Sequence, residues 1–538
     1  MWSLLLVLLA CTALALSLPV IEMGACGMFA EFPLWQISHY AAFVALDAGF
    51  LDPMVKNKEF SANMRMVNTG CDPAVVSKVA LPMLLGQGDV IGRIKSDTVD
   101  VPPVRVMLGC ACSGSSTVMS QLAAPLEVTV VSGSATSPSL SNKAQHPFFA
   151  RVIPSDSKQG AGLAALVKNL AESAPDGWSR IVLLYTEELY SEGIANAFAM
   201  DPSVSNMTIL KEPLPWLPVR SSQEAADYDY ARILTVAKRI AAHRPLPRIF
   251  VFPVNPQDIA APLVRAFHEV GLFNEHSVVF TSESVVDGIR REFDRVVNER
   301  ANWHLASIGK PAEALWANGS DAYDWAGLHG VIDGWLALVP NWQGARSASI
   351  DFHNFWTGLT REKLLAAGMP ASSQIETTWF KDLETFTASM WYSFWFDAVT
   401  AVLVGVGDLF AAGAAPEEVR GSKLRDAIFQ ARFEGLTGNI VFDGNGDRLG
   451  SYKIVNLRGR DDVDVGIYDA GLGQVSFVRC PIFPSGDEQV PGDRPRPCPA
   501  GTEFYGQLCQ ACQYGHFAPL SDSVCVPCTK GSYAAELG

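Results

Sequence analysis

The stretch VVSGSATSPSLSNK, residues 130–143, is the strongest indication of the fold. Its first residues are apolar and β-branched, and they give way abruptly to small hydroxylated residues and a turn that contains Pro138. This change is typical of the carboxyl end of a strand in an open α/β sheet, where ligands bind beside the free N–H groups that begin the next helix. Ser134 and Thr136 stand at that edge. The stretch therefore predicts a site for a small polar ligand.

Residues 104–283 repeat this plan around the stretch. Apolar, β-rich runs alternate with segments of helical periodicity, which is typical of βαβ units and a parallel sheet. The expected strands are residues 105–111, 128–132, 180–185, 248–253 and 277–281, and the expected helices are residues 159–171, 224–242 and 259–270. Residues 41–85 have a weaker pattern and are expected to supply an earlier helix and strand. The fold class is therefore α/β.

Four further segments carry recognisable motifs. They are GCACSGSS at residues 109–116, FFARVIPSDSKQ at 148–159, GWSRIVLLYTEELYSEG at 177–193 and GLTGNIVFDGNGDRLGSYKIVN at 435–456. In order and spacing, these segments and residues 130–143 resemble the ligand-binding region of class C G-protein-coupled receptors, of natriuretic-peptide receptors and of bacterial amino-acid-binding proteins. The resemblance covers most of residues 71–456.

This resemblance implies the Venus-flytrap fold, also called periplasmic binding protein type I. Two Rossmann-like lobes are joined by three crossings of the chain, so each lobe is discontinuous in sequence. We expect a ligand-binding domain at residues 18–479, with lobe one at residues 19–156 and 284–425 and lobe two at residues 157–283 and 426–479. In the family the ligand lies between the lobes, which close on it.

Length and charge restrict the class of protein. A chain of 538 residues exceeds one hydrophobic core and is expected to form two or three domains. The formal net charge of −15 argues against nucleic acids and anionic membrane surfaces as partners. The apolar residues 391–410 contain Asp397 and Asp408, so a buried amphipathic helix is expected there rather than a membrane span. Membrane contact is expected only through a segment outside this chain.

Residues 1–17 are expected to be a secretory signal peptide. The segment is apolar, has a cleavage-like A-L-A sequence at residues 13–15, and lacks the usual basic start. A membrane anchor is the alternative, but the apolar run is short and is broken by Pro19. Asn206 and Asn318 begin glycosylation sequons, which are weak support because such sequons also occur by chance. The expected location is secreted or at the extracellular face of the plasma membrane.

Cysteine usage agrees with export. Once Cys11 is removed with the signal peptide, an even set remains, which favours disulfides in an exported chain. The remaining cysteines are Cys26, Cys71, Cys110, Cys112, Cys480, Cys498, Cys509, Cys512, Cys525 and Cys528. The resemblance implies that Cys71, in TGCDPA, pairs with Cys112 just before the serine-rich turn, which leaves Cys26 with Cys110 as the second pair.

Residues 480–538 are expected to be a separate module. They are rich in Cys, Gly and Pro, and the phrase CPAGT at residues 498–502 resembles the cysteine-rich repeats of ephrin-receptor-like stalks. The C-x2-C pairs at residues 509–512 and 525–528 would also suit a zinc ribbon, but disulfides are favoured behind a signal peptide. The module is expected to be incomplete and to continue in a longer receptor or secreted protein.

A free amino acid carries a carboxylate and an ammonium group close together. Its site therefore needs neutral donors on one side and an acidic or aromatic group on the other. By resemblance, Ser113, Ser134 and Thr136 hold the ligand carboxylate with hydroxyl and backbone N–H groups. The alternative is that they only form a turn and a helix cap.

By the same resemblance, three residues face the ligand ammonium. They are Asp156 in IPSDSKQ, Tyr190 in EELYSEG and Glu283 at the end of a lobe-two strand. Each has a plainer alternative, since Asp156 could cap a helix, Tyr190 could pack on its own lobe and Glu283 could be a surface acid. An acid from lobe two would favour the closed form, because it reaches the ligand only there.

One position departs from the glutamate receptors. They place a lysine for the side-chain carboxylate of the ligand where this chain has Trp391, and no clear basic residue early in lobe one replaces it. Glutamate is therefore not the expected ligand. A neutral or aromatic ligand side chain suits Trp391 better.

The sequence gives no positive reason to expect an enzyme, a cofactor or a metal site. HExxH, GxSxG and Walker motifs are absent, and the nine histidines have no ligand-like spacing. Asp443, Asn445 and Asp447 begin like an EF-hand loop, but Arg448 stands where the loop needs glycine and Ile454 where it needs glutamate. A hairpin with a Gly-Asn-Gly-Asp turn is expected instead.

The leading hypothesis is an extracellular receptor domain that binds a small amino-acid-like ligand and forms a homodimer or heterodimer through lobe one. Two alternatives remain open. One is an extracellular interaction or scaffold protein without a small-molecule ligand. The other is the ectodomain of a receptor guanylate cyclase.

Overall fold

The computed structural model forms two compact units, each built from two separate stretches of the chain. Unit 1 comprises Met1–Ser155 and Pro340–Gly450, and unit 2 comprises Asp156–Val339 and Ser451–Gly538. The structure describes residues 18–27, 34–86, 102–175, 177–214, 223–254, 260–286, 289, 328–345, 347–370, 390–458, 461–492, 502–505, 508–511, 516–517 and 526–527. The expected signal peptide and the sequon at Asn318 lie outside these residues, whereas Asn206 is exposed.

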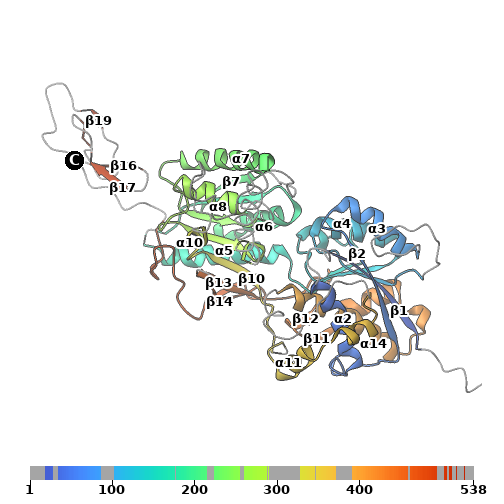
Figure 1. Ribbon diagram of the computed structural model, residues 1–538. Coiled ribbons are helices and arrows are strands. Elements are labelled where there is room, and N and C mark those ends of the chain that lie inside the picture. Colours follow the sequence, from blue (N-terminus) through green and yellow to red (C-terminus); the bar gives the residue numbers. More distant parts are fainter. Residues whose placement is uncertain are drawn as a thin grey trace, which may run out of the picture. The chain divides into compact units, whose positions relative to one another are not determined.

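The core of unit 1 is a parallel five-stranded sheet in the order β2-β1-β3-β4-β5 (Figure 1). Its strands are β1 (Val20–Gly27), β2 (Ser61–Asn68), β3 (Val106–Leu108), β4 (Thr129–Ser132) and β5 (Phe149–Arg151). Every residue of β3, β4 and β5 is buried, as expected for strands covered on both faces. The sequence predicts β3 and β4, but it does not predict β1.

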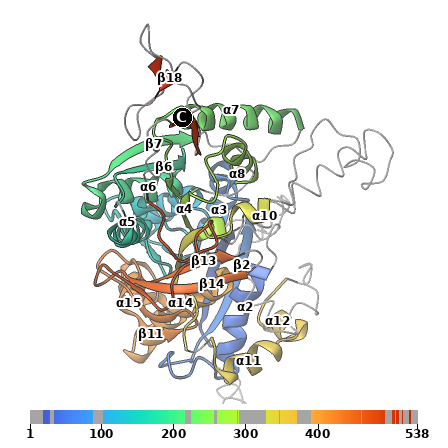
Figure 2. The same cartoon turned by 90° about the vertical axis from the view of Figure 1, so that its left-hand side faces the viewer.

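Helices cover both faces of this sheet. They are α2 (Leu34–Asp47), α3 (Pro73–Leu85), α4 (Ser113–Ala123), α14 (Trp391–Ala411) and α15 (Gly421–Gln430), with the shorter α11 (Ile350–Thr357) and α12 (Arg361–Ala366). On one face, α3 and α4 share an apolar core with Met107 of β3 and Val130 of β4. Alternate strand residues point to the other face, where α14 lies against α2, α15 and β4 (Figure 2).

Helix α14 is buried on all sides. Every residue from Tyr392 to Gly407 is buried, so the helix forms where it is expected but is not amphipathic. It is the one helix in the described part of the chain that is long and apolar enough to cross a membrane, and 78% of its most apolar window is buried in the protein. This burial identifies α14 as the central core helix of unit 1.

Unit 2 contains a mixed eight-stranded sheet in the order β15-β14-β13-β10-β9-β8-β6-β7 (Figure 1). Its strands are β6 (Arg180–Thr186), β7 (Thr208–Leu214), β8 (Ile249–Phe252), β9 (Val278–Ser282), β10 (Leu336–Pro340), β13 (Tyr452–Arg458), β14 (Asp461–Asp469) and β15 (Gln474–Phe477). Strands β7, β6, β8, β9 and β10 run parallel, and β13, β14 and β15 form an antiparallel ribbon. Strands β6, β8 and β9 coincide with predicted runs.

Two pairs of helices pack in unit 2. Helices α5 (Asp156–Ser173) and α6 (Leu189–Met200) share a core with β6, β8, β9 and β10, and α7 (Gln223–Ala241) packs against α8 (Ala260–Glu269). A Cβ at Gly160 would lie 2.5 Å from the Cβ of Ala197, so α5 and α6 approach closely only because residue 160 is glycine. The sequence predicts α5, α7 and α8.

The unit boundaries differ from the expected lobes in two places. Strand β10 pairs with β9, so residues up to Val339 belong to unit 2 and not to lobe one, where residues 284–425 were expected. Residues 426–450 belong to unit 1 and not to lobe two, because β11 (Arg432–Gly435) and β12 (Gly438–Val441) form a hairpin that is bonded to α14. Hydrophobic periodicity predicts a strand but does not say which sheet it joins.

Residues 480–538, which were expected to form a separate module, are grouped with unit 2, and their described part contains two small antiparallel hairpins. They are β16 (Thr502–Tyr505) with β17 (Leu508–Ala511), and β18 (His516–Phe517) with β19 (Val526–Pro527). Cys480, which was expected in a disulfide, is exposed and has a free thiol. Cys498, Cys512, Cys525, Cys528 and the side chain of Cys509 lie outside the described residues.

A buried carboxylate fastens the β11–β12 hairpin to α14. Asp397 is 0% exposed and accepts hydrogen bonds from the N–H groups of Leu436 at 2.8 Å and Thr437 at 2.9 Å, and from the Thr437 hydroxyl at 2.6 Å. Burial raises the pKa of Asp397, and these hydrogen bonds oppose the rise. Without the carboxylate, the N–H groups of the turn would lose their acceptors in a buried place.

Replacing Asp397 is therefore expected to destabilise unit 1. Asp397→Ala should lower the free energy of unfolding by about 3 kcal/mol, because it leaves buried donors without partners. As a control in the same helix, Asp408→Ala removes only a partly exposed ion pair with Lys56 and should cost less than about 1 kcal/mol. Urea unfolding of both variants measures the difference, and equal losses would contradict the anchoring role.

Candidate functional site

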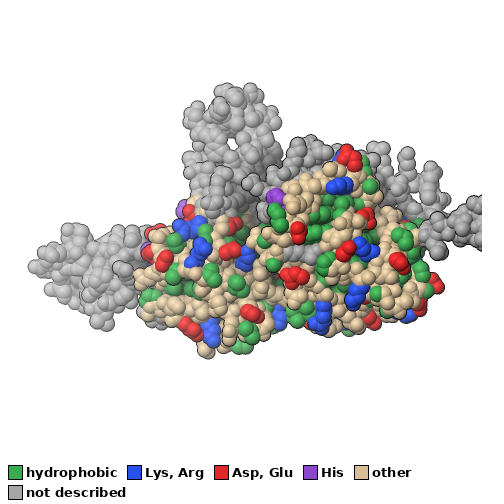
Figure 3. Space-filling view, turned by 90° about the horizontal axis from the view of Figure 1, so that it is seen from below, with side chains coloured by type: hydrophobic (Ala, Val, Ile, Leu, Met, Phe, Trp, Pro, Cys, Tyr) green, Lys and Arg blue, Asp and Glu red, His purple; other side chains and the backbone are tan. Residues whose placement is uncertain are grey.

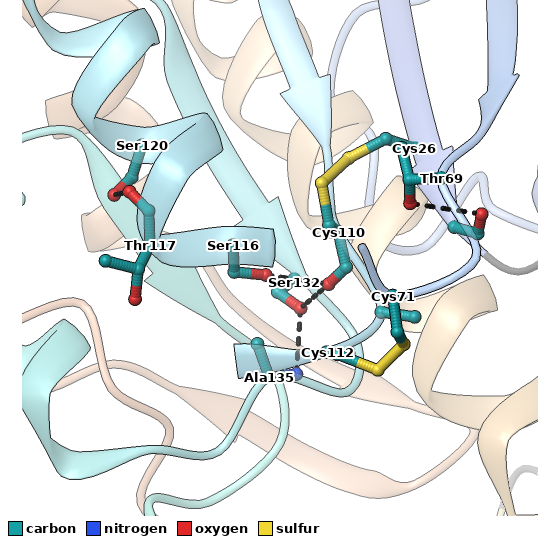
Figure 4. The surroundings of a disulfide bond; sticks show 12 residues. Cys26, Thr69, Cys71, Cys110, Cys112, Ser116, Thr117, Ser120, Ser132 and Ala135 are labelled. Atoms are coloured by element: carbon teal, nitrogen blue, oxygen red, sulfur yellow. Dashed lines mark hydrogen bonds between the residues drawn. A yellow bond between two sulfur atoms is a disulfide. The ribbon is translucent and has the colours of Figure 1, made fainter. Parts of the chain in front are cut away.

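Two disulfides frame the start of α4 in unit 1 (Figure 4). Cys26 of β1 is bonded to Cys110, and Cys71 is bonded to Cys112 at the N-cap of α4, with Cα–Cα distances of 4.7 and 5.4 Å. These are the two expected pairs, Cys71–Cys112 by resemblance and Cys26–Cys110 by exclusion. Gly109 has a φ of 154°, and a Cβ there would lie 2.6 Å from the Cys26 sulfur, so the turn beside the disulfide requires glycine.

Serine hydroxyls connect this turn to the loop after β4. Ser116 and Ser132 both donate to the carbonyl of Cys110, at 2.8 and 3.2 Å (Figure 4). The Ser132 hydroxyl also accepts hydrogen bonds from the N–H groups of Ser134 at 3.2 Å and Ala135 at 2.9 Å. These contacts hold the carboxyl ends of β3 and β4 together at one edge of the sheet.

The predicted residues Ser113, Ser134 and Thr136 lie at this edge. The hydroxyl of Ser113, the first residue of α4, accepts a hydrogen bond from the N–H of Ser137 at 3.2 Å. The Ser134 hydroxyl donates to the carbonyl of Ala111 at 2.7 Å, and Thr136 is 2% exposed. The residues therefore build the turn, as the plainer alternative expects, and they also stand beside the start of a helix, as the ligand hypothesis expects.

The start of α4 presents backbone N–H groups. Its N-cap residue, Cys112, makes no side-chain hydrogen bond to the helix. The first hydrogen bond of the helical ladder runs from the N–H of Ser116 to the carbonyl of Cys112, at 2.9 Å. The N–H groups before Ser116 point out of the helix end, where the helix dipole also favours an anion. A carboxylate or phosphate oxygen is a suitable acceptor for them.

In unit 2 a buried carboxylate lies just after β9. Glu283 is 1% exposed, so it is not a surface acid. Its carboxylate accepts hydrogen bonds from the Tyr190 hydroxyl at 2.9 Å and from the Gln159 side chain. Gln159 also donates to the carbonyl of Leu338 at 2.7 Å, which fixes the amide against β10. Tyr190 and Gln159 are neutral donors, and their hydrogen bonds orient the carboxylate.

Tyr190 and Asp156 belong to the same group. Burial raises the pKa of Tyr190 well above its ordinary value, and the charges of Glu283 and Asp156 raise it further, so the phenol stays protonated. The Tyr190 ring also packs on the core of unit 2, as its plainer alternative expects. Asp156 is 1% exposed and is the first residue of α5. It therefore stands at a helix end, as its plainer alternative expects, and its charge also acts on Tyr190.

The sequence does not predict Gln159 as a member of this group. The residue follows Asp156 by three positions on α5, and residues three apart share one face of a helix. That spacing is the signal from which Gln159 could have been found. A lone glutamine on a helix is otherwise typical of an exposed face, whereas Gln159 is 1% exposed.

Trp391 lies at the end of α14 that meets the loop after β4. It is the first residue of the helix and is partly buried. A Cβ at Gly133 would lie 3.0 Å from the backbone of Phe394 and from the ring of Trp395, so this end of α14 packs tightly on the loop. An aromatic surface therefore adjoins the edge that carries Ser134.

The acidic segment after β12 forms a turn. The Asp443 carboxylate accepts hydrogen bonds from the N–H groups of Asn445 at 2.8 Å and Asp447 at 3.0 Å, and the Asp443 N–H donates to the Asp447 carbonyl at 2.9 Å. This is the expected Gly-Asn-Gly-Asp turn. Among the described residues, no group of three or more His, Cys, Asp or Glu side chains is arranged to hold a metal ion.

Comparisons with known proteins give one family and several receptor relatives. Residues 41–460 match the model of the family described as "Receptor family ligand binding region". Metabotropic glutamate receptor-like protein E of Dictyostelium discoideum is 25% identical over 414 residues, which are 75% of this chain and 41% of the relative. Glutamate receptor 2.2 of Arabidopsis thaliana is 21% identical over 410 residues, 72% of this chain and 36% of the relative. Metabotropic glutamate receptor 6 of Oryctolagus cuniculus is 24% identical over 389 residues, which are 66% of this chain and 38% of the relative.

The extent of these matches fits the architecture. The chain spans only 36–41% of the length of these relatives, so it corresponds to a part of each of them. The family match covers most of the strands of both sheets. Two units with parallel strands flanked by helices are the architecture of the type I periplasmic binding protein fold. This chain belongs to the family of receptor ligand-binding regions.

Proposed function

We propose that this chain is the extracellular ligand-binding region of a class C-like receptor and that its ligand is a small, amino-acid-like molecule. The observation that carries the proposal is the buried Glu283 carboxylate, which Tyr190 and Gln159 orient with neutral donors. A ligand ammonium suits this place, because it can donate charge-assisted hydrogen bonds to an oriented carboxylate. The Tyr190 ring would add a cation–π contact worth about 0.5–2 kcal/mol.

The edge of unit 1 supplies the complementary half of the proposed site. The backbone N–H groups at the start of α4 and the hydroxyls of Ser113, Ser134 and Thr136 suit a ligand carboxylate. A ligand that uses groups of both units stabilises the arrangement in which both reach it. Closure of the two units on the ligand is therefore the proposed output.

A neutral or aromatic side chain is proposed for the ligand. The names of the three relatives refer to glutamate receptors. This chain, however, has Trp391 where the glutamate receptors are expected to carry a lysine, and the helix end that bears Trp391 packs on the loop of Ser134. An indole offers apolar surface in place of a cation, which disfavours a second ligand carboxylate.

Export and a stalk complete the proposal. Two disulfides in unit 1 and the exposed sequon residue Asn206 support an extracellular location, as the expected signal peptide does. The small hairpins at residues 502–527 support a cysteine-rich stalk fragment. Asp156 completes the proposed ammonium site beside Tyr190.

Association through unit 1 is a further part of the proposal. Helix α3 exposes Leu81 (38%) and Leu85 (43%), which are four residues apart and lie on one side of the helix. Exposed apolar side chains on one face favour a protein partner.

The surface charge argues against a nucleic-acid partner. Acidic and basic side chains are interspersed on the face shown in Figure 3, and the net charge of the chain is −15.

A ligand screen tests the proposed function directly. At a hundred times its dissociation constant, an amino acid that binds only the folded chain should raise the unfolding free energy by about 2.7 kcal/mol. We expect at least one of the twenty common L-amino acids or γ-aminobutyrate to raise the melting temperature of ligand-free protein. The double variant Ser134→Ala, Thr136→Ala should abolish the shift, whereas Ser173→Ala with Thr235→Ala, two exposed hydroxyls of unit 2, should preserve it. A screen without any shift favours the scaffold alternative.

The charge of Glu283 should determine the affinity for the ammonium group. Glu283→Gln keeps the size of the side chain and one oxygen acceptor but removes the charge, so affinity should fall about 10- to 100-fold. Glu187→Gln, an exposed position of the same unit, should leave affinity unchanged. Isothermal titration calorimetry with the amino acid found in the screen measures both. Equal affinity of wild type and Glu283→Gln would refute an ammonium site at this carboxylate.

Closure should be visible in solution. Small-angle scattering of wild-type protein is expected to show a smaller radius of gyration when the amino acid from the screen is added, because the ligand favours the arrangement in which both units reach it. In Glu283→Gln the decrease should be reduced at a ligand concentration that saturates the variant. Tight binding without any decrease in wild type would contradict the proposed output.

A further inference from the structure

A buried arginine holds the loop that carries Thr136. Arg151, the last residue of β5, is 0% exposed. One terminal nitrogen of its guanidinium donates to the carbonyls of Ala135 at 3.2 Å and Ser137 at 2.8 Å. The two carbonyls lie on either side of Thr136, so a single side chain fixes the backbone before and after that residue.

The direction of these carbonyls also sets the direction of an N–H group. In a trans peptide the carbonyl of one residue and the N–H of the next point in opposite directions. The Ala135 carbonyl points toward Arg151, so the N–H of Thr136 points away from the guanidinium. The Ser137 carbonyl precedes Pro138, which has no N–H. Thr136 is therefore the residue whose N–H orientation depends on Arg151.

The guanidinium is anchored from the other side by the turn after β12. Its Nε donates to the Asp447 carboxylate at 2.7 Å, and its second terminal nitrogen donates to the Ser141 hydroxyl at 2.6 Å. Ser141 in turn donates to Asp447 at 2.5 Å. The backbone reinforces the pair, because the Arg151 N–H donates to the Gly446 carbonyl at 2.9 Å and the Arg448 N–H donates to the Arg151 carbonyl at 3.2 Å.

We propose that Arg151 is a positioning residue for ligand binding. Held by its ion pair with Asp447, Arg151 keeps residues 135–137 in the geometry that binds the ligand. This inference rests on the proposed function, because it assigns the loop to the ligand carboxylate. Charge-assisted hydrogen bonds are about twice as strong as neutral ones. Four of them converge on one guanidinium here, so the loop is fixed before any ligand arrives. Preorganisation of this kind raises affinity because less ordering remains for the binding step.

Arg448 provides a matched control. It is 5% exposed and lies in the same turn, and it donates to the carbonyls of Val152 at 3.0 Å, Thr437 at 2.6 Å and Asn439 at 3.2 Å. It is thus a buried arginine with carbonyl partners, like Arg151, but these partners lie outside residues 135–137. A purely structural role predicts the same consequences for Arg151→Lys and Arg448→Lys.

Hydrogen exchange on ligand-free protein separates the two roles without reference to a ligand. The reporter groups are the N–H of Ala135, which donates to Ser132, and the N–H of Ser137, which donates to Ser113. Arg151→Lys should accelerate their exchange at least about tenfold relative to amides of β4, because the loop opens locally, and Arg448→Lys should not. Equal exchange in Arg151→Lys and wild type would overturn the proposal.

Binding measurements then connect the loop to affinity. The probe is whichever of the twenty common L-amino acids or γ-aminobutyrate shifts the melting temperature of wild type. Its affinity should be about tenfold weaker in Arg151→Lys and unchanged in Arg448→Lys, with melting temperatures of the two variants similar. Faster loop exchange with unchanged affinity would overturn the ligand role. If no probe binds wild type, the proposed function fails, while the exchange result still decides whether Arg151 orders the loop.

A second variant covers the case in which Arg151→Lys does not fold. Asp447→Asn keeps the shape of the anchor and one oxygen acceptor, but it removes the charge that holds the guanidinium. It should accelerate exchange of the same two amides and weaken probe binding in the same direction as Arg151→Lys. Asp426→Asn, an exposed acid on α15, should leave both quantities at the wild-type values. A folded Asp447→Asn with a protected loop and unchanged affinity would overturn the proposal.

Discussion

Unit 1 depends on the buried carboxylate of Asp397, because this side chain holds the hairpin through which the two stretches of the chain are joined. The first stretch ends at Ser155 and the second begins at Pro340. Asp397 of α14 accepts three hydrogen bonds from the turn between β11 and β12. The carbonyl of Leu436 in that turn accepts the N–H of Gly344 at 2.8 Å, just after the second stretch begins. One acid thus fixes the hairpin and the start of the second stretch to the core helix.

The same hairpin reaches the first stretch near its end. The segment from Gly446 to Arg448 pairs with Arg151 beside the edge strand β5, and Arg448 donates to the carbonyl of Val152. The guanidinium of Arg151 in turn donates to the carbonyls of Ala135 and Ser137 and so holds the loop of Thr136. A continuous set of hydrogen bonds therefore runs from the central helix, through the hairpin, to the loop after β4. Within this set, the Arg151 side chain is the member that bonds the loop carbonyls directly.

Elements that a local pattern of residues determines can be predicted from the sequence. Contacts between residues far apart in the chain cannot. The strands β3, β4, β6, β8 and β9 are predictable because buried parallel strands are continuous apolar runs. Strand β1 is missed because VIEMGACG interrupts its apolar residues with Glu22 and two glycines. The pair Arg151–Asp447 is separated by 296 residues, so no local pattern connects the two charges. Cysteine counting leaves many pairings open, so Cys71–Cys112 is found through resemblance and Cys26–Cys110 by exclusion from it.

The charged groups proposed to act on a ligand are held differently in unit 1 and in unit 2. In unit 1 the buried cation of Arg151 is compensated by Asp447, so the loop can stay in one geometry without a ligand. In unit 2 the Tyr190 hydroxyl and the Gln159 amide donate to the buried Glu283 carboxylate, so two neutral side chains orient it. Under the proposed function, unit 1 would supply a preformed loop for the ligand carboxylate, and unit 2 would supply an oriented carboxylate for the ligand ammonium.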